Sequence, residues 1–277
     1  MPLQRVCTPT TPTLWKIPVS SRALQFETTP LPQIHSPGKL ALELKTWRSV
    51  ARLPGYLAKT RQRPQQQASG QPVMTLPGIG FGDEALYVTR RHLKRLGFDV
   101  HGWKLGVNIG SVPETIPKVA QRVAELVEQT GQPIALVGWS LGGYLAREVA
   151  RENPELVSQV VTLASPIKGG PKYTVFSKLY ELQGMDIDAM ETIIASRDAV
   201  SIQTPITCIY SKNDGIVDWR AVADFHSPNV TRIEVDATHA AMGFDPLVLE
   251  HVGDALLGGL QAIESDRKSP KVPAQSS

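Results

Sequence analysis

From residue 72 onward, short apolar runs alternate with longer segments in which apolar residues recur at helical spacing. The apolar runs predict strands at 73–76, 99–105, 134–137, 157–163, 206–210 and 231–235. The periodic segments predict helices at 83–96, between 111 and 131, at 141–151, near 219–225 and at 246–260. An alternation of strands and helices is typical of a parallel sheet that helices cover on both faces. The pattern therefore predicts an α/β fold.

The helix between 111 and 131 carries its own start and stop signals. Ser111 and Glu114 have the spacing of a capping box, and Pro113 falls in the first turn. Gly131 stands where a helix end is expected. We therefore expect a regular, amphipathic helix with a side-chain cap on Ser111.

A second amphipathic segment, 38–59, lies before the sheet-forming region. We expect it to be helical, with its apolar face packed on the main domain. The residues on that face are Leu40, Leu44, Trp47 and Ala51. Binding of Trp47 and its basic neighbours to a membrane surface stays open as an alternative.

The composition divides the rest of the chain into segments. Residues 1–37 are rich in proline and predict an extended or disordered arm, and 61–71 reads as a polar linker. We therefore expect a helix and linker at 38–71, a catalytic domain at 72–262 and a disordered tail at 263–277.

The strongest chemical signal is the run IALVGWSLGGY, in which Gly138, Ser140 and Gly142 form the pattern G-x-S-x-G. A predicted strand precedes it and a predicted helix follows it. Such a turn strains the backbone of the serine and lifts its hydroxyl above the sheet edge. The positions two residues away must be small, because the turn brings them against the strand and the helix. The run predicts that Ser140 is a catalytic nucleophile at a nucleophile elbow.

A serine hydroxyl needs a base that accepts its proton, and in this arrangement the base follows the serine along the chain. Three histidines do so. His251 falls inside the last predicted helix, and His226 precedes a strand and so lies at the wrong sheet edge. His239 follows a strand and lies at the carboxyl edge, where catalytic groups of open α/β sheets gather. We therefore assign His239 as the general base.

The base in turn needs an acid that orients its ring. Asp214 follows the strand 206–210 and lies at the same carboxyl edge as His239. Asp218 stands further on, where it suits a helix cap, and Asp236 is too near His239 in sequence to reach the far ring nitrogen. We therefore assign Asp214 as the third member of the triad.

Acyl transfer passes through an oxyanion that needs backbone N–H donors. We expect the N–H groups of Leu141, directly after the nucleophile, and of Ile79, in the glycine-rich loop 77–82, to supply them. The same loop resembles a dinucleotide-binding fingerprint, but Asp83 stands where that motif needs its third glycine. We therefore expect no nucleotide cofactor.

The motifs PGIG, VGWSLGG, YSKNDGIVDW and DATH resemble the α/β-hydrolase superfamily, in particular its bacterial esterase- and lipase-like members. The resemblance covers about 72–260. It implies an α/β-hydrolase fold with a mostly parallel sheet, and hydrolysis of carboxylic esters through an acyl-enzyme on Ser140. Pro77 stands where many members of the superfamily have a histidine before the oxyanion glycine. The alternatives are an acyltransferase that uses the same triad with an alcohol acceptor, and a non-catalytic relative that binds a hydrophobic ligand.

An apolar insert at 170–203 predicts a short helical cap over a pocket for a hydrophobic acyl chain. A helical pair that packs on the sheet with no substrate role is the alternative. We assign four side chains to substrate binding: Phe81, Trp139, Met185 and Met190.

Charge and cysteine content limit the other classes of function. The net charge of +3 and pI of about 8.8 are too modest for a nucleic-acid-binding protein. The two cysteines, Cys7 and Cys208, give neither a disulfide framework nor a metal-binding spacing. Neither a membrane-spanning segment nor a secretory signal is predicted. We expect a cytoplasmic enzyme that acts on a small-molecule ester without a cofactor or metal.

Overall fold

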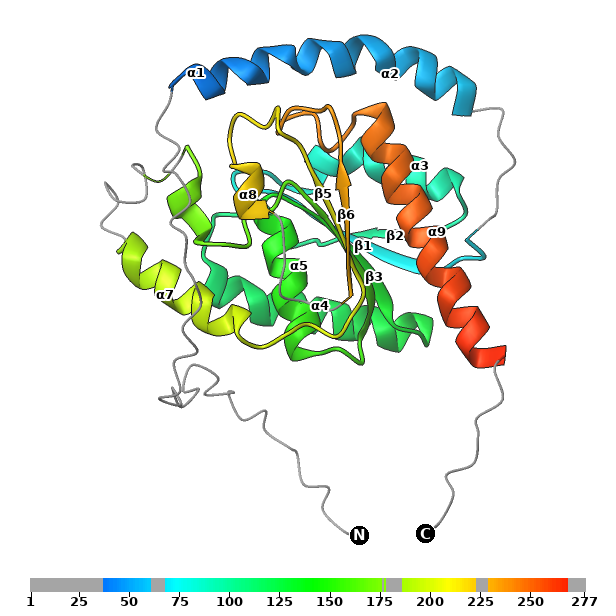
Figure 1. Ribbon diagram of the computed structural model, residues 1–277. Helices are drawn as coiled ribbons and strands as arrows, with labels where there is room; N and C mark the ends of the chain where they lie inside the picture. The colour runs from blue at the N-terminus through cyan, green and yellow to red at the C-terminus, as the bar shows by residue number, and fades with distance from the viewer. Residues whose placement is uncertain (1–36, 61–67, 176, 178–185, 223–228, 269–277) are drawn as a thin grey trace. The chain divides into compact units, whose positions relative to one another are not determined.

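The apolar runs form one sheet of six parallel strands, in the order β2-β1-β3-β4-β5-β6, within the part of the chain that the computed structural model describes (Figure 1). That part comprises residues 37–60, 68–175, 177, 186–222 and 229–268. The strands are β1 (Pro72–Leu76), β2 (Asp99–Gly102), β3 (Ile134–Trp139), β4 (Val157–Leu163), β5 (Ile206–Tyr210) and β6 (Val230–Glu234). The parallel α/β arrangement that the sequence predicts is confirmed.

The helices lie where the periodic segments predict them, with differences at their ends. They are α1 (Pro37–Leu40), η1 (Ala41–Lys45), α2 (Thr46–Thr60), η2 (Asp83–Leu86), α3 (Tyr87–Arg95), α4 (Val112–Thr130), α5 (Leu141–Glu152), η3 (Gly170–Tyr173), α7 (Ile187–Asp198), α8 (Trp219–Val222) and α9 (Pro246–Lys268). The helix expected at 83–96 begins as a 3₁₀ turn, and α9 continues past 260. Of the helices in the described residues, none is both long enough and apolar enough to cross a membrane.

Two apolar layers cover the two faces of the sheet. Adjacent residues of β3 point to opposite faces, because side chains alternate along a strand. Val137 packs in the cluster that contains Val252 of α9. Leu136 packs in the cluster that contains Val123 of α4 and Leu145 of α5. The helices α3 and α9 therefore cover one face, and α4 and α5 cover the other.

The strand expected at 99–105 ends earlier, at Gly102. The carboxylate of Asp83 accepts hydrogen bonds from the backbone N–H groups of Trp103 (3.0 Å) and Lys104 (3.2 Å). Lys104 also has a positive φ of 59°, which turns the backbone away from the sheet. A side chain thus takes the donors that a longer strand would have used.

The expected capping box does not form at the start of α4. The Ser111 side chain makes no capping hydrogen bond. Its backbone carbonyl accepts from the Thr115 hydroxyl (2.6 Å), which does not satisfy the N–H groups of the first turn. The end of the helix is as expected, since Gly131 adopts the left-handed conformation with φ of 70°.

The N-terminal helices pack on the domain through their polar side, which corrects the expectation that the apolar face packs. The hydroxyl of Ser49 donates to Asp245 (2.5 Å), and the Tyr56 hydroxyl is 3.1 Å from Nδ1 of His92. The residues of the expected packing face are all exposed: Leu40, Leu44, Trp47 and Ala51. Specific polar partners on the domain decide this orientation, and hydrophobic periodicity alone does not reveal them.

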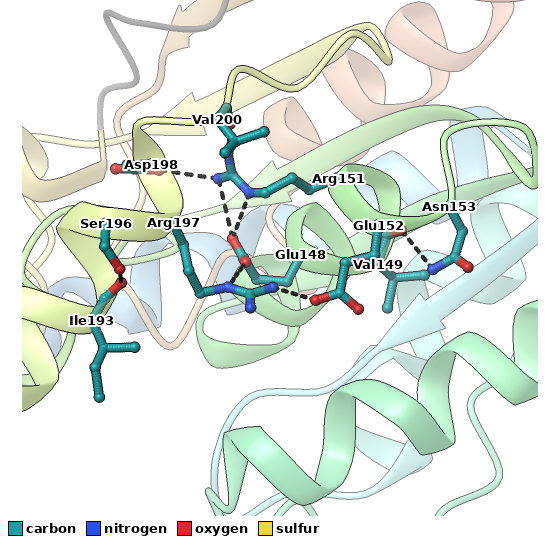
Figure 2. A network of polar contacts seen from close by, with 10 residues as sticks. All are labelled: Glu148, Val149, Arg151, Glu152, Asn153, Ile193, Ser196, Arg197, Asp198 and Val200. Carbon is teal, nitrogen blue, oxygen red and sulfur yellow. Dashed lines mark hydrogen bonds and ion pairs between the residues drawn. The ribbon is translucent and has the colours of Figure 1, made fainter. Parts of the chain in front are cut away.

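A network of charged residues fastens α7 to α5 (Figure 2). The buried carboxylate of Glu148 accepts from Arg151 (3.2 Å) and also from Arg197 of α7. Arg197 donates to Glu152 as well (2.5 Å), and Arg151 reaches Asp198 (3.1 Å). Burial acts to lower the pKa of Arg197, but the surrounding carboxylates raise it overall. The network therefore holds the end of the 170–203 insert against the main domain.

Replacing Glu148 by alanine is expected to lower the free energy of unfolding by about 3 kcal/mol. The reason is that the change leaves partly buried guanidinium groups without their shared carboxylate. Urea denaturation measures this loss, with Glu128→Ala on the exposed side of α4 as the matched control. Equal free energies of unfolding for the two variants would show that the network does not stabilise the fold.

Candidate active site

Ser140 lies at the turn between β3 and α5, with the strained backbone that the motif predicts. Its φ is 54° and its ψ is −125°, a conformation that residues other than glycine rarely adopt. A Cβ atom at Gly138 would collide with the backbone of Gly143, and one at Gly142 would collide with the carbonyl of Leu76. The turn therefore requires the two glycines of the G-x-S-x-G pattern.

The structure brings the three predicted triad residues together at the carboxyl edge of the sheet, and all three side chains are buried. Nε2 of His239 is 3.1 Å from the Ser140 hydroxyl, and Nδ1 of His239 is 2.8 Å from Oδ2 of Asp214. The other carboxylate oxygen, Oδ1, accepts from the backbone N–H groups of Ile216 and Val217, both at 2.8 Å. Those two bonds fix the carboxylate so that Oδ2 faces the imidazole.

The alternative acids and bases lie elsewhere. Asp218 accepts from the backbone N–H two residues ahead (2.9 Å), at the start of α8, as expected of a helix cap. Asp236 is exposed and accepts from the side chain of Asn213 (2.5 Å). His251 lies within α9, and His226 lies outside the described residues. In the described part of the chain, the relay of contacts thus runs through Asp214 and His239.

The two residues whose N–H groups are expected to bind an oxyanion belong to α5 and to the loop after β1. Leu141 is the first residue of α5, so its N–H is at a helix N-terminus. Ile79 follows Gly78, whose position is so close to the elbow that an added Cβ would be 3.2 Å from Cβ of Ser140. The loop that carries Ile79 is therefore beside the serine, as the sequence predicts.

Asn108, which the sequence reasoning did not single out, braces this loop. Its buried side chain donates to the carbonyl of Pro77 (2.9 Å). Its carbonyl accepts from the N–H of Gly80 (2.7 Å), and its own N–H donates to the carbonyl of Phe81 (2.9 Å). Three hydrogen bonds from one residue hold the loop in place. No sequence motif marks Asn108, because its partners are backbone groups of a different loop.

Of the four expected substrate-binding residues, two lie beside the triad. The indole N–H of Trp139 donates to the carbonyl of His239 (3.1 Å), and its ring centroid is 5.1 Å from that of the exposed Phe81. Met190 is half-buried on α7, whose described polar contacts run to η3 and α5. Met185 lies outside the described residues.

Glu43 of η1 joins the two loops that carry the acid and the base, a role that no sequence motif indicates. Its Oε1 accepts from the backbone N–H of Gly215 (2.8 Å) and of His239 (3.0 Å), and its Oε2 accepts from that of Ala240 (2.9 Å). A Cβ atom at Gly215 would collide with the carbonyl of Lys39, so glycine permits this approach. One carboxylate thus fixes the backbone on both sides of the relay.

Further polar contacts fix the same helices on the triad loops. The ammonium group of Lys45 donates to Asn213 (3.0 Å), the residue before Asp214. The hydroxyl groups of Thr46 and Thr238 are 2.7 Å apart, next to the base. The N-terminal helices therefore form part of the scaffold of the site.

Replacing Glu43 by alanine is expected to lower kcat on a simple ester by roughly 10- to 100-fold with little change in KM. Small displacements of a catalytic group have effects of this size. Glu43→Gln keeps one acceptor oxygen and is expected to recover part of the loss. Steady-state kinetics of both variants, with Glu128→Ala as control, measure this. An unchanged kcat in a folded Glu43→Ala variant would refute the positioning role.

One family model and several known proteins match parts of this sequence. The model of a family described as an uncharacterised protein family (UPF0227) matches residues 90–252, more than half of the chain. A pimeloyl-[acyl-carrier protein] methyl ester esterase of Aliivibrio fischeri is 28% identical over 105 residues, which are 36% of this chain and 39% of the esterase. A homoserine O-acetyltransferase of Thermus thermophilus is 41% identical over 68 residues, 24% of this chain and 18% of that enzyme. The matched segments thus span less than half of either relative.

Solved structures resemble the described fold over about two thirds of the chain. The lipase BlEst2 of Bacillus licheniformis in its mature form has a TM-score of 0.56 at 14% identity, and covers 68% of this chain and 92% of its own. The monoacylglycerol lipase of Paleococcus ferrophilus has a TM-score of 0.52 at 17% identity, with 69% and 96% covered. At this identity the likeness establishes the fold, and the expected α/β-hydrolase fold is confirmed.

Proposed function

We propose that this chain, which belongs to the uncharacterised protein family UPF0227 and has an α/β-hydrolase fold, is a serine hydrolase of carboxylic esters. The observation that supports the proposal most is the relay of contacts from Asp214 through His239 to Ser140, at 2.8 and 3.1 Å. A serine with positive φ at the strand–helix turn, beside the glycine-rich loop 77–82, supports it further.

The reaction runs through an acyl-enzyme. The Ser140 oxygen attacks the ester carbonyl while Nε2 of His239 takes its proton, and the carboxylate of Asp214 stabilises the resulting imidazolium. The N–H groups of Leu141 and Ile79 donate to the oxyanion. Collapse of the intermediate expels the alcohol, which takes the proton from His239. Water then loses a proton to His239 and attacks the acyl group, and collapse of the second intermediate returns that proton to the serine.

Transfer of the acyl group to an alcohol other than water is the second candidate. The 41% identical segment of a homoserine O-acetyltransferase favours it. Incubation of the protein with a p-nitrophenyl ester, with and without an added alcohol, separates the two. Release of the free acid at the same rate in both cases supports hydrolysis. Conversion of most of the acyl group into a new ester would favour transfer.

A hydrophobic acyl chain is the substrate group that we propose. The buried ring of Trp139 lies against His239, and the exposed ring of Phe81 lies against Trp139. The start of the 170–203 insert pairs with the loop after Asp214 through an antiparallel bridge between Thr174 and Val217. That attachment supports a cap next to the triad. The names of the esterase and lipases that the chain resembles are consistent with an ester substrate.

An acyl pocket predicts a dependence of kcat/KM on chain length. Each buried methylene contributes about 0.8 kcal/mol, so two further carbons are expected to raise kcat/KM roughly tenfold until the pocket is full. If the insert caps the pocket, a Met185→Ser/Met190→Ser variant should flatten this dependence and leave acetate ester hydrolysis nearly unchanged. Ile193→Ser, an exposed position on α7, is the matched control. An equal loss on acetate and octanoate esters would place the acyl pocket elsewhere.

A further inference from the structure

The helices α1 and α2, which η1 joins along the chain (Figure 1), carry a row of large exposed apolar side chains. The exposed fractions are 52% for Leu40, 77% for Leu44, 66% for Trp47 and 54% for Val50. The opposite side of the same helices is fixed on the domain through the polar contacts of Glu43, Thr46 and Ser49. This apolar row therefore cannot turn inward without breaking those contacts.

Two exposed basic side chains lie on the same helices as the apolar row. Residues 37–60 contain five basic residues and one carboxylate: Lys39, Lys45, Arg48, Arg52, Lys59 and Glu43. Three of the basic residues contact the domain, since Lys39 pairs with Asp218, Arg52 pairs with Asp245 and Lys45 donates to Asn213. The carboxylate of Glu43 binds the loops that carry Asp214 and His239, so it does not balance the charge of the outer face. Arg48, within the row, and Lys59, near the end of α2, are exposed. The outer face is thus both apolar and positively charged.

Further exposed apolar residues lie at the same edge of the sheet. Phe81 belongs to the loop after β1, and Val107 and Ile109 belong to the loop after β2, so all three follow the carboxyl ends of strands. Glu43 contacts the loops after β5 and β6, which places η1 at that edge too. Much of the exposed apolar surface of the described residues is therefore on the side of the molecule that carries the triad.

We propose that the face of α1–η1–α2 formed by Leu40, Leu44, Trp47, Val50, Arg48 and Lys59 is a docking surface for an anionic lipid membrane. A helix with Trp and Leu on one face and Lys and Arg beside them lies in the plane of the interface, with the apolar side chains among the lipid headgroups. Indole rings favour this depth, and basic side chains attract anionic lipid.

Charge argues against two other occupants. A second copy of the chain would bring Arg48 and Lys59 of one molecule towards the same positive face of the other, which opposes self-association through a shared patch. A nucleic acid would be attracted by the basic residues but would leave the apolar row in water. The proposal goes beyond ester hydrolysis and does not depend on it, because its test measures binding.

The test is sedimentation of the full chain with vesicles of phosphatidylcholine alone or mixed with phosphatidylglycerol. We expect binding to the mixed vesicles and much weaker binding to the neutral ones. Leu44→Ser/Trp47→Ser should bind at least about tenfold more weakly, because it removes the two most exposed apolar anchors. Arg48→Gln/Lys59→Gln should lose about fivefold for each charge. The matched control is Ile193→Ser/Val200→Ser, which removes exposed apolar residues elsewhere and should bind as the wild type does.

All these positions are exposed, so thermal unfolding of each variant should match that of the wild type. Failure of the wild type to bind the mixed vesicles would overturn the proposal. Equal binding by Leu44→Ser/Trp47→Ser would overturn it as well. A concentration-dependent dimer that this variant converts to a monomer, without vesicle binding, would identify the occupant as a second copy instead.

Discussion

Replacing Ser140 by alanine is expected to remove ester hydrolysis, with kcat lower by about 10⁶-fold. The change deletes the attacking oxygen but leaves the elbow, since the fold around it depends on Gly138 and Gly142. The backbone hydrogen bond from the Ser140 N–H to the carbonyl of Leu163 (2.8 Å) is also kept. Hydrolysis of p-nitrophenyl esters measures the loss of kcat, and the thermal unfolding temperature shows whether the fold is intact.

Ser111→Ala is the matched control, because the Ser111 hydroxyl makes no capping hydrogen bond. It should retain wild-type kcat and stability. Activity above a few per cent of wild type in a folded Ser140→Ala variant would contradict the assignment of the nucleophile.

Asp214→Asn is expected to lower kcat by about 10⁴-fold, less than the loss of the nucleophile itself. The side chain has two tasks, since one oxygen accepts from the N–H groups of Ile216 and Val217 and the other accepts from His239. An amide keeps the first task only if its oxygen faces the two N–H groups. Its NH₂ group then faces Nδ1 of His239, which places the ring proton on Nε2, where it blocks proton transfer from Ser140.

Asp218→Asn and Asp236→Asn are the matched controls for the acid. Asp218 caps α8 and Asp236 lies at the surface, so kcat should fall far less in these variants. A greater loss of kcat in Asp218→Asn than in Asp214→Asn would identify Asp218 as the acid of the triad.

The meeting of three polar side chains at the sheet edge could be predicted, because the three residues obey a rule of the fold. Ser140, Asp214 and His239 each follow a strand of a parallel sheet, and the carboxyl ends of such strands meet at one edge. Apolar runs show where the strands end, so sequence order and edge together select the residues. The alternation of strands and covering helices was also predictable, because buried strands and amphipathic helices differ in the period of their apolar residues.

The scaffold around the triad could not be predicted in this way. Glu43 is 196 positions away from His239, and its partners are backbone N–H groups, which leave no trace in the sequence. Asn108 likewise binds backbone atoms of another loop. The apolar face of 38–59 was expected to pack inward because burial is the commoner outcome for such a face. The polar partners of Ser49 and Tyr56 reverse that orientation, and only their positions in space reveal it.

Several expectations stay predictions. They include the boundaries of the arm and the tail, the cytoplasmic location and the substrate contacts of Met185 and Met190. The ends of strands and helices were the least predictable detail. The side chain of Asp83 bonds the backbone just after β2, and the Ser111 side chain does not cap α4. Both outcomes depend on single side chains rather than on a periodic pattern.

Covalent labelling with an alkyl fluorophosphonate shows whether Ser140 is an activated nucleophile, because the reagent reacts with a serine that a base has activated. Peptide mapping by mass spectrometry identifies the modified residue without any assumption about the natural ester. We expect one adduct, on Ser140, that forms much more slowly in Asp214→Asn and is absent from Ser140→Ala. An adduct on another residue, or a folded wild-type protein that does not react, would contradict it.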